Sequence, residues 1–533
     1  MRYRSTALAL SILFFAGTLP PRAAADNRHE IKHVLLISVD GLHALDVARY
    51  VRLHPNSALA ELSGHGLTYS NARTPSNSDS FPGLLALITG GSPISHGLFY
   101  DVSYDRNEFD PSNTSCSGQA GAPQVFDESI DLYDANNVSL NVIDPAKLPR
   151  VLENGKCVPL FPHSAMRTNT IFEVVKASGG RTAWADKHPA YDIANGPSGK
   201  GVDDLFTPEI TNVGGLDNTV SVVCTLNNDV LKVQAVLNEI HGRTHDGRPA
   251  RVPAVFGMNF QAVSVGQKLS KDNSDGSCKA DTQFTGQAGG YTDGSGTPST
   301  VLAFALDSVD EALGDMIKAL KSERLYDSTL FIVSAKHGQS PINPKNLNKP
   351  GHFADLVAQL PDAGTSSAAA AIATAANCPN GSCGFVQDDD IALIWLADQS
   401  HDADVAGYLN TNAKALFIEN VLAGDELKLK FRDPLHDSRT PDIIVQPVYG
   451  TIYTTSGKKN AEHGGFSFGD TNVGLIVSNP TFSGRVVKTP VTTAQVAPSI
   501  LAALGLDPDQ LGAVRKEGTQ VLPFLFGGEG DEN

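Results

Sequence analysis

The chain has 533 residues, of which 41% are hydrophobic, so it can bury a large core, and one large α/β domain with insertions fits this length. Its formal net charge at pH 7 is −17. This acidic balance argues against binding to nucleic acid backbones, which requires clustered lysine and arginine, and is typical of a soluble surface.

The first 25 residues have the pattern of a secretory signal peptide. Arg2 and Arg4 form a basic start, residues 7–19 form an apolar run that is too short to span a bilayer, and residues 23–25 are small alanines at which cleavage is expected. We therefore predict a secreted or periplasmic protein. No later stretch has the length and apolarity from which a membrane span would be predicted.

After this segment, apolar strands alternate with helices. Strands are predicted at residues 32–38, 181–185, 254–258, 329–334, 391–396, 442–445 and 473–477. Helices are predicted at residues 57–64, 81–89, 170–177, 230–240, 301–324, 404–412 and 494–504. Such alternation predicts an α/β fold, with a mostly parallel central sheet and helices on both of its faces.

Three segments interrupt the alternation and are predicted to be insertions into one domain that extends over residues 26–530. Residues 102–165 are loop-like, and residues 264–300 are rich in glycine, serine, aspartate and threonine. Residues 340–433 combine an alanine-rich helix with a strand and a further helix, and are interpreted as a cap. Long loops in compact domains often serve as lids or binding loops, so we expect these segments to shape a pocket.

Six cysteines follow the predicted signal peptide, which favours disulfide bonds in an exported chain. The short loop between Cys378 and Cys383 predicts that these two pair. Proximity along the chain suggests two further pairs, Cys116 with Cys157 and Cys224 with Cys278. The close cysteine and histidine spacings of zinc sites are absent from the sequence, so a metal role for the cysteines is the weaker reading.

Polar residues follow the ends of two predicted core strands. Asp40 comes just past the first strand, and Lys336 and His337 come just past the strand at 329–334. Ser80 directly precedes a predicted helix, where backbone N–H groups favour an anion. Because the carboxyl ends of parallel strands meet at one edge of a sheet, these side chains are expected to converge there.

An ordered set of motifs extends this pattern along the chain. The segments are Ser38-Val39-Asp40-Gly41, Ser80-Phe81-Pro82-Gly83, Gly91-Ser92-Pro93-Ile94-Ser95-His96-Gly97, Lys336-His337-Gly338 and His463-Gly464. In this order they resemble the alkaline phosphatase superfamily, and in particular its type I phosphodiesterase/nucleotide pyrophosphatase branch. Residues 439–445 and 496–506 are similar to the C-terminal pattern of that branch, so the resemblance extends over residues 32–510 outside the insertions.

The resemblance implies an alkaline phosphatase-like fold and a hydrolase in which a threonine or serine attacks phosphorus between two zinc ions. Ser80 matches the nucleophile of the family. Asp40, His337 and His463 match three of the side chains that bind the metal ions. A small-molecule ester is the implied substrate.

Other positions of the family pattern are changed in this chain. Lys336 stands in the place of an aspartate ligand, and Gln267 falls where a histidine ligand belongs. Gln261 or Ser264 stands near a further aspartate position, and Asp101 stands where the family has an asparagine that contacts phosphate. We interpret Asp101, Gln261 and His188, which follows the strand predicted at 181–185, as substrate-binding residues.

These changes alter the metal chemistry that the resemblance implies. A lysine ammonium has no lone pair and repels a cation, and an amide oxygen such as that of Gln267 suits a hard ion such as Ca²⁺ better than Zn²⁺. We therefore predict a site for a divalent metal, zinc or calcium, with fewer than two tightly bound ions. Its predicted ligands are Asp40, His337, His463 and Gln267.

The sequence leaves three functions open. The first is an exported hydrolase in which Ser80 attacks a phosphodiester or a related ester. The second is a secreted binding protein on a catalytically degenerate scaffold. The third is an enzyme for a substrate other than a phosphate ester, in which Lys336 replaces a metal by stabilising an anion or by deprotonating Ser80. We predict the first, with Ser80 and Lys336 as the catalytic residues.

Overall fold

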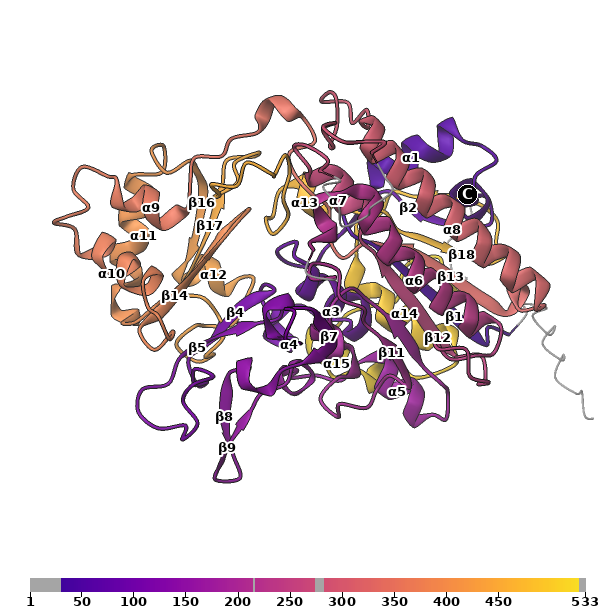
Figure 1. Cartoon of the computed structure of the whole chain (residues 1–533), viewed down its shortest axis with the longest axis horizontal. Helices are drawn as coiled ribbons and strands as arrows, with labels where there is room; N and C mark the ends of the chain where they lie inside the picture. The colour runs from indigo at the N-terminus through magenta and orange to yellow at the C-terminus, as the bar shows by residue number, and fades with distance from the viewer. Residues whose placement is uncertain (1–29, 214–215, 274–281, 527–533) are drawn as a thin grey trace, which may run out of the picture.

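The computed structural model describes residues 30–213, 216–273 and 282–526 (Figure 1). The predicted signal peptide lies outside these residues. The centre of the molecule is an eight-stranded sheet in the order β11-β10-β12-β1-β13-β18-β2-β19. Its strands are β1 (His33–Val39), β2 (Gly66–Tyr69), β10 (Ala183–Ala185), β11 (Asp204–Phe206), β12 (Val255–Phe260), β13 (Thr329–Ser334), β18 (Ile476–Ser478) and β19 (Arg485–Val487).

Strand direction confirms the predicted sheet. The central strand β1 pairs in parallel with β12 and β13, and β10 pairs in parallel with β11 and β12. The strand predicted at 473–477 forms β18, which runs antiparallel to β13 and β2, and β19 then runs parallel to β2. The sheet is therefore mostly parallel, and the turns that follow β1, β10, β12 and β13 lie at the same edge.

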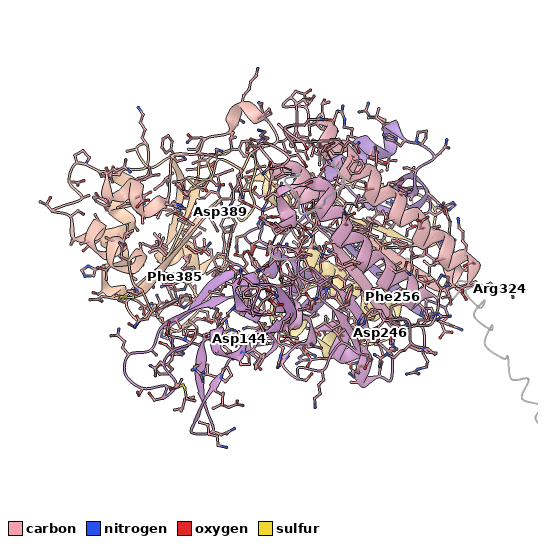
Figure 2. All side chains as sticks on the ribbon, viewed as in Figure 1. Asp144, Asp246, Phe256, Arg324, Phe385 and Asp389 are labelled. Atoms are coloured by element: carbon pink, nitrogen blue, oxygen red, sulfur yellow. A yellow bond between two sulfur atoms is a disulfide. The ribbon has the colours of Figure 1, made fainter. Side chains whose placement is uncertain are left out.

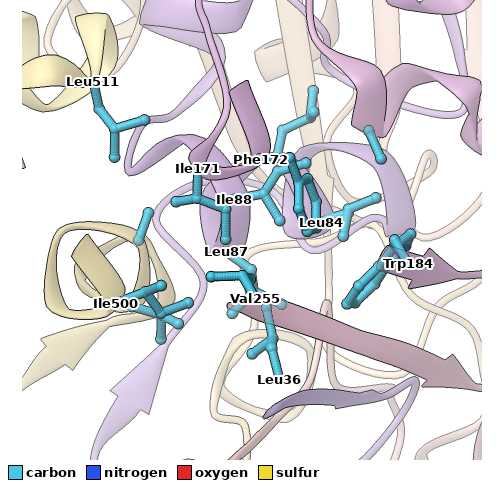
Figure 3. Packing of buried hydrophobic residues seen from close by; sticks show 14 of the residues in the cluster. Leu36, Leu84, Leu87, Ile88, Ile171, Phe172, Trp184, Val255, Ile500 and Leu511 are labelled. Atoms are coloured by element: carbon cyan, nitrogen blue, oxygen red, sulfur yellow. The ribbon is translucent and has the colours of Figure 1, made fainter. Parts of the chain in front are cut away.

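Both faces of the sheet are buried, as the near-continuous apolar sequence of β1 indicates. Leu36 packs against helices α3 (Ser80–Thr89), α5 (Ile171–Ala177) and α14 (Val496–Ala503), and part of this packing is visible in Figure 3. Ile37 points to the opposite face, which helices α1 (Ala44–Leu53), α6 (Val222–Ile240) and α8 (Thr300–Ser322) cover. Helices on both faces confirm the predicted fold class.

A second, four-stranded antiparallel sheet, β14-β15-β17-β16, lies beside the main sheet (Figure 1). Its strands are β14 (Gly384–Asp388), β15 (Ala392–Leu396), β16 (Ile418–Ala423) and β17 (Ile443–Pro447). Helices α9 (Phe353–Ala358), α10 (Ser367–Ala376) and α11 (Asp402–Thr411) pack on it. The prediction of a core strand at 442–445 is wrong, because β17 belongs to this second sheet. A fully buried strand has the same apolar sequence in either sheet.

The predicted loop-like segment 102–165 contains three short hairpins. They pair β4 (Val102–Asp105) with β5 (Ala122–Val125), β6 (Asp131–Tyr133) with β7 (Ser139–Ile143), and β8 (Arg150–Glu153) with β9 (Lys156–Pro159). Shorter elements elsewhere are α2 (Ala58–Gly64), β3 (Ala72–Arg73), α4 (Pro93–His96), α12 (Gly424–Lys428), α13 (Phe468–Thr471), β20 (Val491–Thr492) and α15 (Gly512–Glu517).

Two of the predicted disulfide bonds are present. Cys116 pairs with Cys157 across the insertion of hairpins, and Cys378 pairs with Cys383. The predicted partner of Cys224 is residue 278, which lies outside the described residues. None of the helices in the described ranges combines the length and apolarity needed to cross a membrane.

Candidate active site

Turns from four neighbouring strands meet at the carboxyl edge of the main sheet, where ligands bind in open α/β folds. Asp40 follows β1, Asp186 and Lys187 follow β10, and Lys336 and His337 follow β13. Residues 259–261, at the end of β12, and the first residue of α3 reach the same place. The structure therefore brings several predicted site residues into direct contact, together with others that the sequence did not single out.

Asp40 is the buried centre of this cluster. Its Oδ2 atom lies 3.1 Å from Nζ of Lys187, 3.1 Å from Nδ2 of Asn259 and 3.7 Å from Nζ of Lys336. Its Oδ1 atom lies 3.7 Å from Nε2 of His337. Burial alone would raise the pKa of this carboxyl group, but the charges of Lys336 and Lys187 outweigh burial and hold the pKa well below its usual range. Asp40 is therefore a carboxylate.

Ser80 begins helix α3, whose N-cap residue is Asp79. The Ser80 Oγ atom lies 3.2 Å from Nε2 of His337. Because Nδ1 of His337 lies 3.0 Å from the carbonyl of Gly338 and donates to it, Nε2 is the nitrogen that accepts the hydroxyl proton. Burial lowers the pKa of His337, although Asp40 has the opposite effect, and the lowered pKa favours the neutral ring. The arrangement is that of a serine nucleophile with a histidine base.

Gly83 allows α3 to approach this edge of the sheet. A Cβ atom on Gly83 would lie 2.0 Å from the carbonyl oxygen of Lys336, so a larger residue would push the helix and Ser80 away. This contact explains the glycine of the Ser80-Phe81-Pro82-Gly83 motif. Pro82 is accommodated because it lies in the first turn of the helix, where its missing N–H is not needed.

Lys187 is the main site residue that the sequence analysis missed. It is 8% exposed, and its Nζ atom donates to the Gln261 side-chain oxygen at 2.8 Å and lies 3.5 Å from Ser80 Oγ. Burial opposes its charge, but Asp40 and Asp186 together raise its pKa above the usual value. The available signal was its position: a lysine directly past a buried strand at the carboxyl edge of the sheet.

Lys336 reaches the same carboxylate from inside the protein and is fully buried. Its Nζ atom lies 3.2 Å and 3.4 Å from the two carboxylate oxygens of Asp186 and 2.8 Å from the Tyr191 hydroxyl oxygen. The ammonium also lies 4.1 Å from the centre of the Tyr191 ring, a cation–π distance. Burial lowers the pKa of Lys336, against the opposite effects of Asp186 and Asp40.

His463 packs its ring on that of His337, with the ring centres 3.8 Å apart. Its Nε2 atom lies 3.5 Å from Glu462, and its Nδ1 atom lies 3.7 Å from Asp79. Burial, followed by the nearby His337, holds the pKa of His463 well below its usual value. A neutral ring in this position can contact a substrate or support the orientation of His337.

The two predicted glutamines lie in different environments. Gln261 contacts Lys187 as described, whereas the Gln267 amide donates to the carbonyl of Gly41 at 2.8 Å and to the Tyr291 hydroxyl at 3.1 Å. Helix α7 (Ala262–Lys268) occupies the start of the predicted loop 264–300 and turns Gln267 towards the backbone after Asp40. In the described part of the chain, its hydrogen bonds do not involve the carboxylate of Asp40.

A cavity of about 450 Å³ opens beside Lys187. Its lining includes three predicted substrate-binding residues, Asp101, His188 and Gln261, together with His463. His188 is held by Glu209 at 2.9 Å, and burial and the charge of Asp79 raise the pKa of Asp101. Asp389, directly after β14, contributes to the wall from the cap, and Figure 2 labels it at the second sheet. The cavity therefore lies between the cap and the carboxyl edge of the main sheet.

This fold and this edge cluster define an alkaline phosphatase-like α/β protein. The family model for type I phosphodiesterases/nucleotide pyrophosphatases matches residues 34–136 and 286–468, more than half of the chain. The chain therefore belongs to this family, whose members are hydrolases of phosphodiester and phosphate ester bonds. No curated protein matches its sequence.

Solved structures resemble the chain over nearly its whole length. Murine ectonucleotide pyrophosphatase/phosphodiesterase 5, in an inactive form in complex with AMP, is 14% identical, with 90% of this chain and 96% of that chain covered and a TM-score of 0.49. Wild-type alkaline phosphatase PafA is 13% identical, with 90% and 96% covered and a TM-score of 0.54. At these identities the PafA likeness supports the fold.

Family members are zinc-dependent, but the residues of this site do not fit a pair of zinc ions. The Oδ2 atom of Asp40 already receives Lys187 and Asn259, and Lys336 lies beside it, so a metal ion on this carboxylate would lie close to two ammonium groups. At an effective dielectric of about 20, unit charges about 4 Å apart interact by about 4 kcal/mol, so a dication beside either ammonium is repelled by about twice that. Within the described ranges, no three His, Cys, Asp or Glu side chains are arranged to hold an ion.

Proposed function

We propose that the chain is an exported hydrolase that cleaves a phosphodiester or a related ester, with Ser80 as the nucleophile. The observation that carries the proposal is the position of Ser80 Oγ, 3.2 Å from the unprotonated nitrogen of His337 and 3.5 Å from the ammonium of Lys187. A nucleophile, its base and a cation for the developing charge thus meet at one atom. Membership of a family of ester hydrolases supports the same reaction.

The reaction proceeds in two displacements. His337 takes the hydroxyl proton as Ser80 Oγ bonds to phosphorus, and the bond from phosphorus to the leaving oxygen breaks. The leaving oxygen departs on the side opposite Ser80 and takes a proton from solvent, to which His337 releases its own. The neutral ring next deprotonates a water molecule, whose oxygen bonds to phosphorus as the bond from phosphorus to Ser80 Oγ breaks, and His337 returns that proton to Ser80 Oγ. Throughout, the ammonium of Lys187 stabilises negative charge on the reacting oxygens.

The cavity supports a small-molecule ester as the substrate. Asp101, His188, Gln261 and His463 line the cavity together with Lys187, and residues of the cap close one side of it. The disulfide bonds fit an oxidising compartment and so support export. We assign residues 26–530 to one hydrolase domain whose insertions at 102–165, 264–300 and 340–433 shape the cavity, and residues 1–25 to the signal peptide.

The test is turnover of bis(p-nitrophenyl) phosphate, p-nitrophenyl phosphate and the corresponding sulfate and phosphonate esters by the purified protein and its Ser80→Ala variant. Loss of the nucleophile is expected to lower kcat by about 10⁴-fold or more on the best substrate. The circular dichroism spectrum is expected to stay unchanged, because the serine-to-alanine change removes one oxygen. Ser112→Ala, in an exposed loop, is the matched control and is expected to keep full activity.

Two outcomes would contradict the proposal. Normal turnover by the Ser80→Ala variant would remove Ser80 as the nucleophile. A native protein that binds such esters without hydrolysing any of them would instead favour a secreted binding protein on this scaffold, which was the second function left open by the sequence.

A further inference from the structure

Two ammonium groups lie close to the central carboxylate of the site. Lys187 reaches Asp40 from the cavity and Lys336 reaches it from the protein interior, and both approach the same oxygen, at 3.1 Å and 3.7 Å. An oxygen with these neighbours has its lone pairs directed at positive charge. This is the electrostatic environment that a bound metal ion would otherwise create at a ligand carboxylate.

Asp186 joins the two lysines into one unit. Its Oδ1 atom accepts the backbone N–H of Lys187 at 2.9 Å and lies 3.2 Å from the ammonium of Lys336, while its Oδ2 atom accepts the indole N–H of Trp184 at 3.1 Å. Two carboxylates therefore balance two ammonium groups in a buried cluster. Such a cluster is stable only when each charge is paired and hydrogen-bonded, and this one meets both conditions.

We propose that Lys187 and Lys336 supply, as fixed cations, the positive charge that bound zinc supplies in the family, so that the site works without a metal ion. Lys187 is the catalytic member of the pair, because it faces the cavity and lies within 3.5 Å of Ser80 Oγ. Lys336 is a positioning residue that acts through Asp40 and Asp186. The proposal rests on the proposed function for the reaction, but zinc binding can be tested without it.

The first experiment measures zinc on the native, full-length mature protein, purified without chelators. We expect less than about 0.1 zinc per chain by elemental analysis, and no site tighter than about 10 μM by titration calorimetry with zinc chloride, because two cations already hold Asp40. A tight zinc site that disappears in Asp40→Asn or His463→Ala would overturn the proposal, whatever the activity of the protein. The buried atoms Asp40 Oδ1 and His463 Nδ1, which accept no hydrogen bond among the described residues, are the ones such a site would use.

The reverse substitution gives a second measurement on the same protein. Lys336→Asp removes one cation and adds a carboxylate, and is expected to bind zinc at least about tenfold more tightly than the native chain. Lys336→Met, of similar length and without charge, is the matched control and is expected to gain no zinc. Equal zinc affinity in the native chain and the Lys336→Asp variant would contradict the role of Lys336, provided that both keep the native circular dichroism spectrum.

The activity experiment uses the best ester found for the native protein. Activity is expected to remain within about twofold after treatment with EDTA or phenanthroline, and Lys187→Gln is expected to lower kcat by about 10²–10³-fold with a smaller change in KM. Lys318→Gln, on an exposed helix surface, is the control. Loss of activity on chelation with recovery on added zinc would overturn the proposal while leaving Ser80 as the nucleophile. Absence of any esterase activity would overturn the proposed function alone, since the zinc measurements would still stand.

Discussion

The site is built from two regions of the chain that differ in how closely they follow the family. Residues 34–136 and 286–468, which the family model matches, supply Asp40, Ser80, His337 and His463. Residues 137–285 lie between the matched segments and supply Asp186, Lys187, Asn259 and Gln261. The first set, here the nucleophile side, contains the proposed nucleophile and the proposed base. The second set, here the lysine side, presents the ammonium of Lys187 and the amide of Asn259 to the same carboxylate, and Gln261 accepts from Lys187.

The two regions depend on each other at the site. Lys336 belongs to a matched segment, yet its ammonium contacts Asp186 and Tyr191 from the region without a match. A lysine at this position without Asp186 would be a buried and poorly paired charge, which is strongly unfavourable. The change in one region is therefore compatible with folding only because the other region supplies its partner.

Replacing His337 is expected to have the largest effect, and it tests whether the nucleophile side carries the reaction. If the nucleophile side carries the reaction, His337→Gln lowers kcat by about 10³-fold, because the amide has no basic nitrogen to accept the Ser80 proton. The measurement is steady-state kinetics on the best ester. His436→Gln, on an exposed side chain, is expected to keep native kinetics. Comparable activity in His337→Gln and the native chain would mean that the base is a residue of the lysine side and not His337.

Replacing Asp229 tests which contacts hold the turn that carries Gln261 on the lysine side. This buried carboxylate accepts the backbone N–H groups of Gln261 at 3.0 Å and Ala262 at 2.8 Å, and pairs with buried Lys232 at 2.9 Å. Lys232 also donates to the carbonyl of Asn259 at 2.8 Å. Asp229→Asn leaves Lys232 unpaired, so unfolding in urea should show a loss of about 3–5 kcal/mol in the free energy of unfolding.

The double variant Asp229→Asn/Lys232→Met is the control, because it removes both charges. It is expected to recover most of the stability that the single variant loses. Activity should fall in both variants, since Gln261 and its contact with Lys187 depend on the turn that Asp229 holds. If the single and double variants are equally stable, the pair does not support this turn through its charges.

The parts of the molecule that the sequence predicted are those that depend on local patterns. The apolar run of residues 33–39 is a buried strand in any α/β sheet, and Asp40 after it must lie at the carboxyl edge. The sheet to which a buried strand belongs could not be predicted in the same way. The strand β17 has the apolar pattern of a core strand, but it belongs to the sheet of the cap. No local feature distinguishes the two sheets.

The lysine side was harder to predict because its residues depend on contacts across long distances in sequence. Lys187 meets Asp40 across 147 residues, and no motif marks it. Gln267 was predicted as a ligand because it falls where the family has a histidine, but residues 262–268 are helical, so residues 261 and 267 point in directions about 120° apart around the helix axis. Spacing therefore located the segment, and only the helix shows where each amide points.

The smallest effect is expected for His245, which lies in residues 137–285 but outside the site. Its replacement tests whether this region can lose stability without a change at the site. At the edge strand β11, His245 Nδ1 lies 2.5 Å from Asp204 Oδ1, and this hydrogen bond raises the pKa of His245 above its usual 6.5. The stabilisation is therefore fully present below about pH 6.5 and is lost as the pH rises through the raised value. His245→Gln should lower the free energy of unfolding by less than about 1 kcal/mol near pH 5.5, because the pair is partly exposed, and by still less near pH 9. Urea unfolding at both pH values measures this, with kcat for the best ester expected to stay native. A larger loss at pH 9 than at pH 5.5 would contradict a charged His245, and a fall in kcat would mean that this edge and the lysine side are coupled.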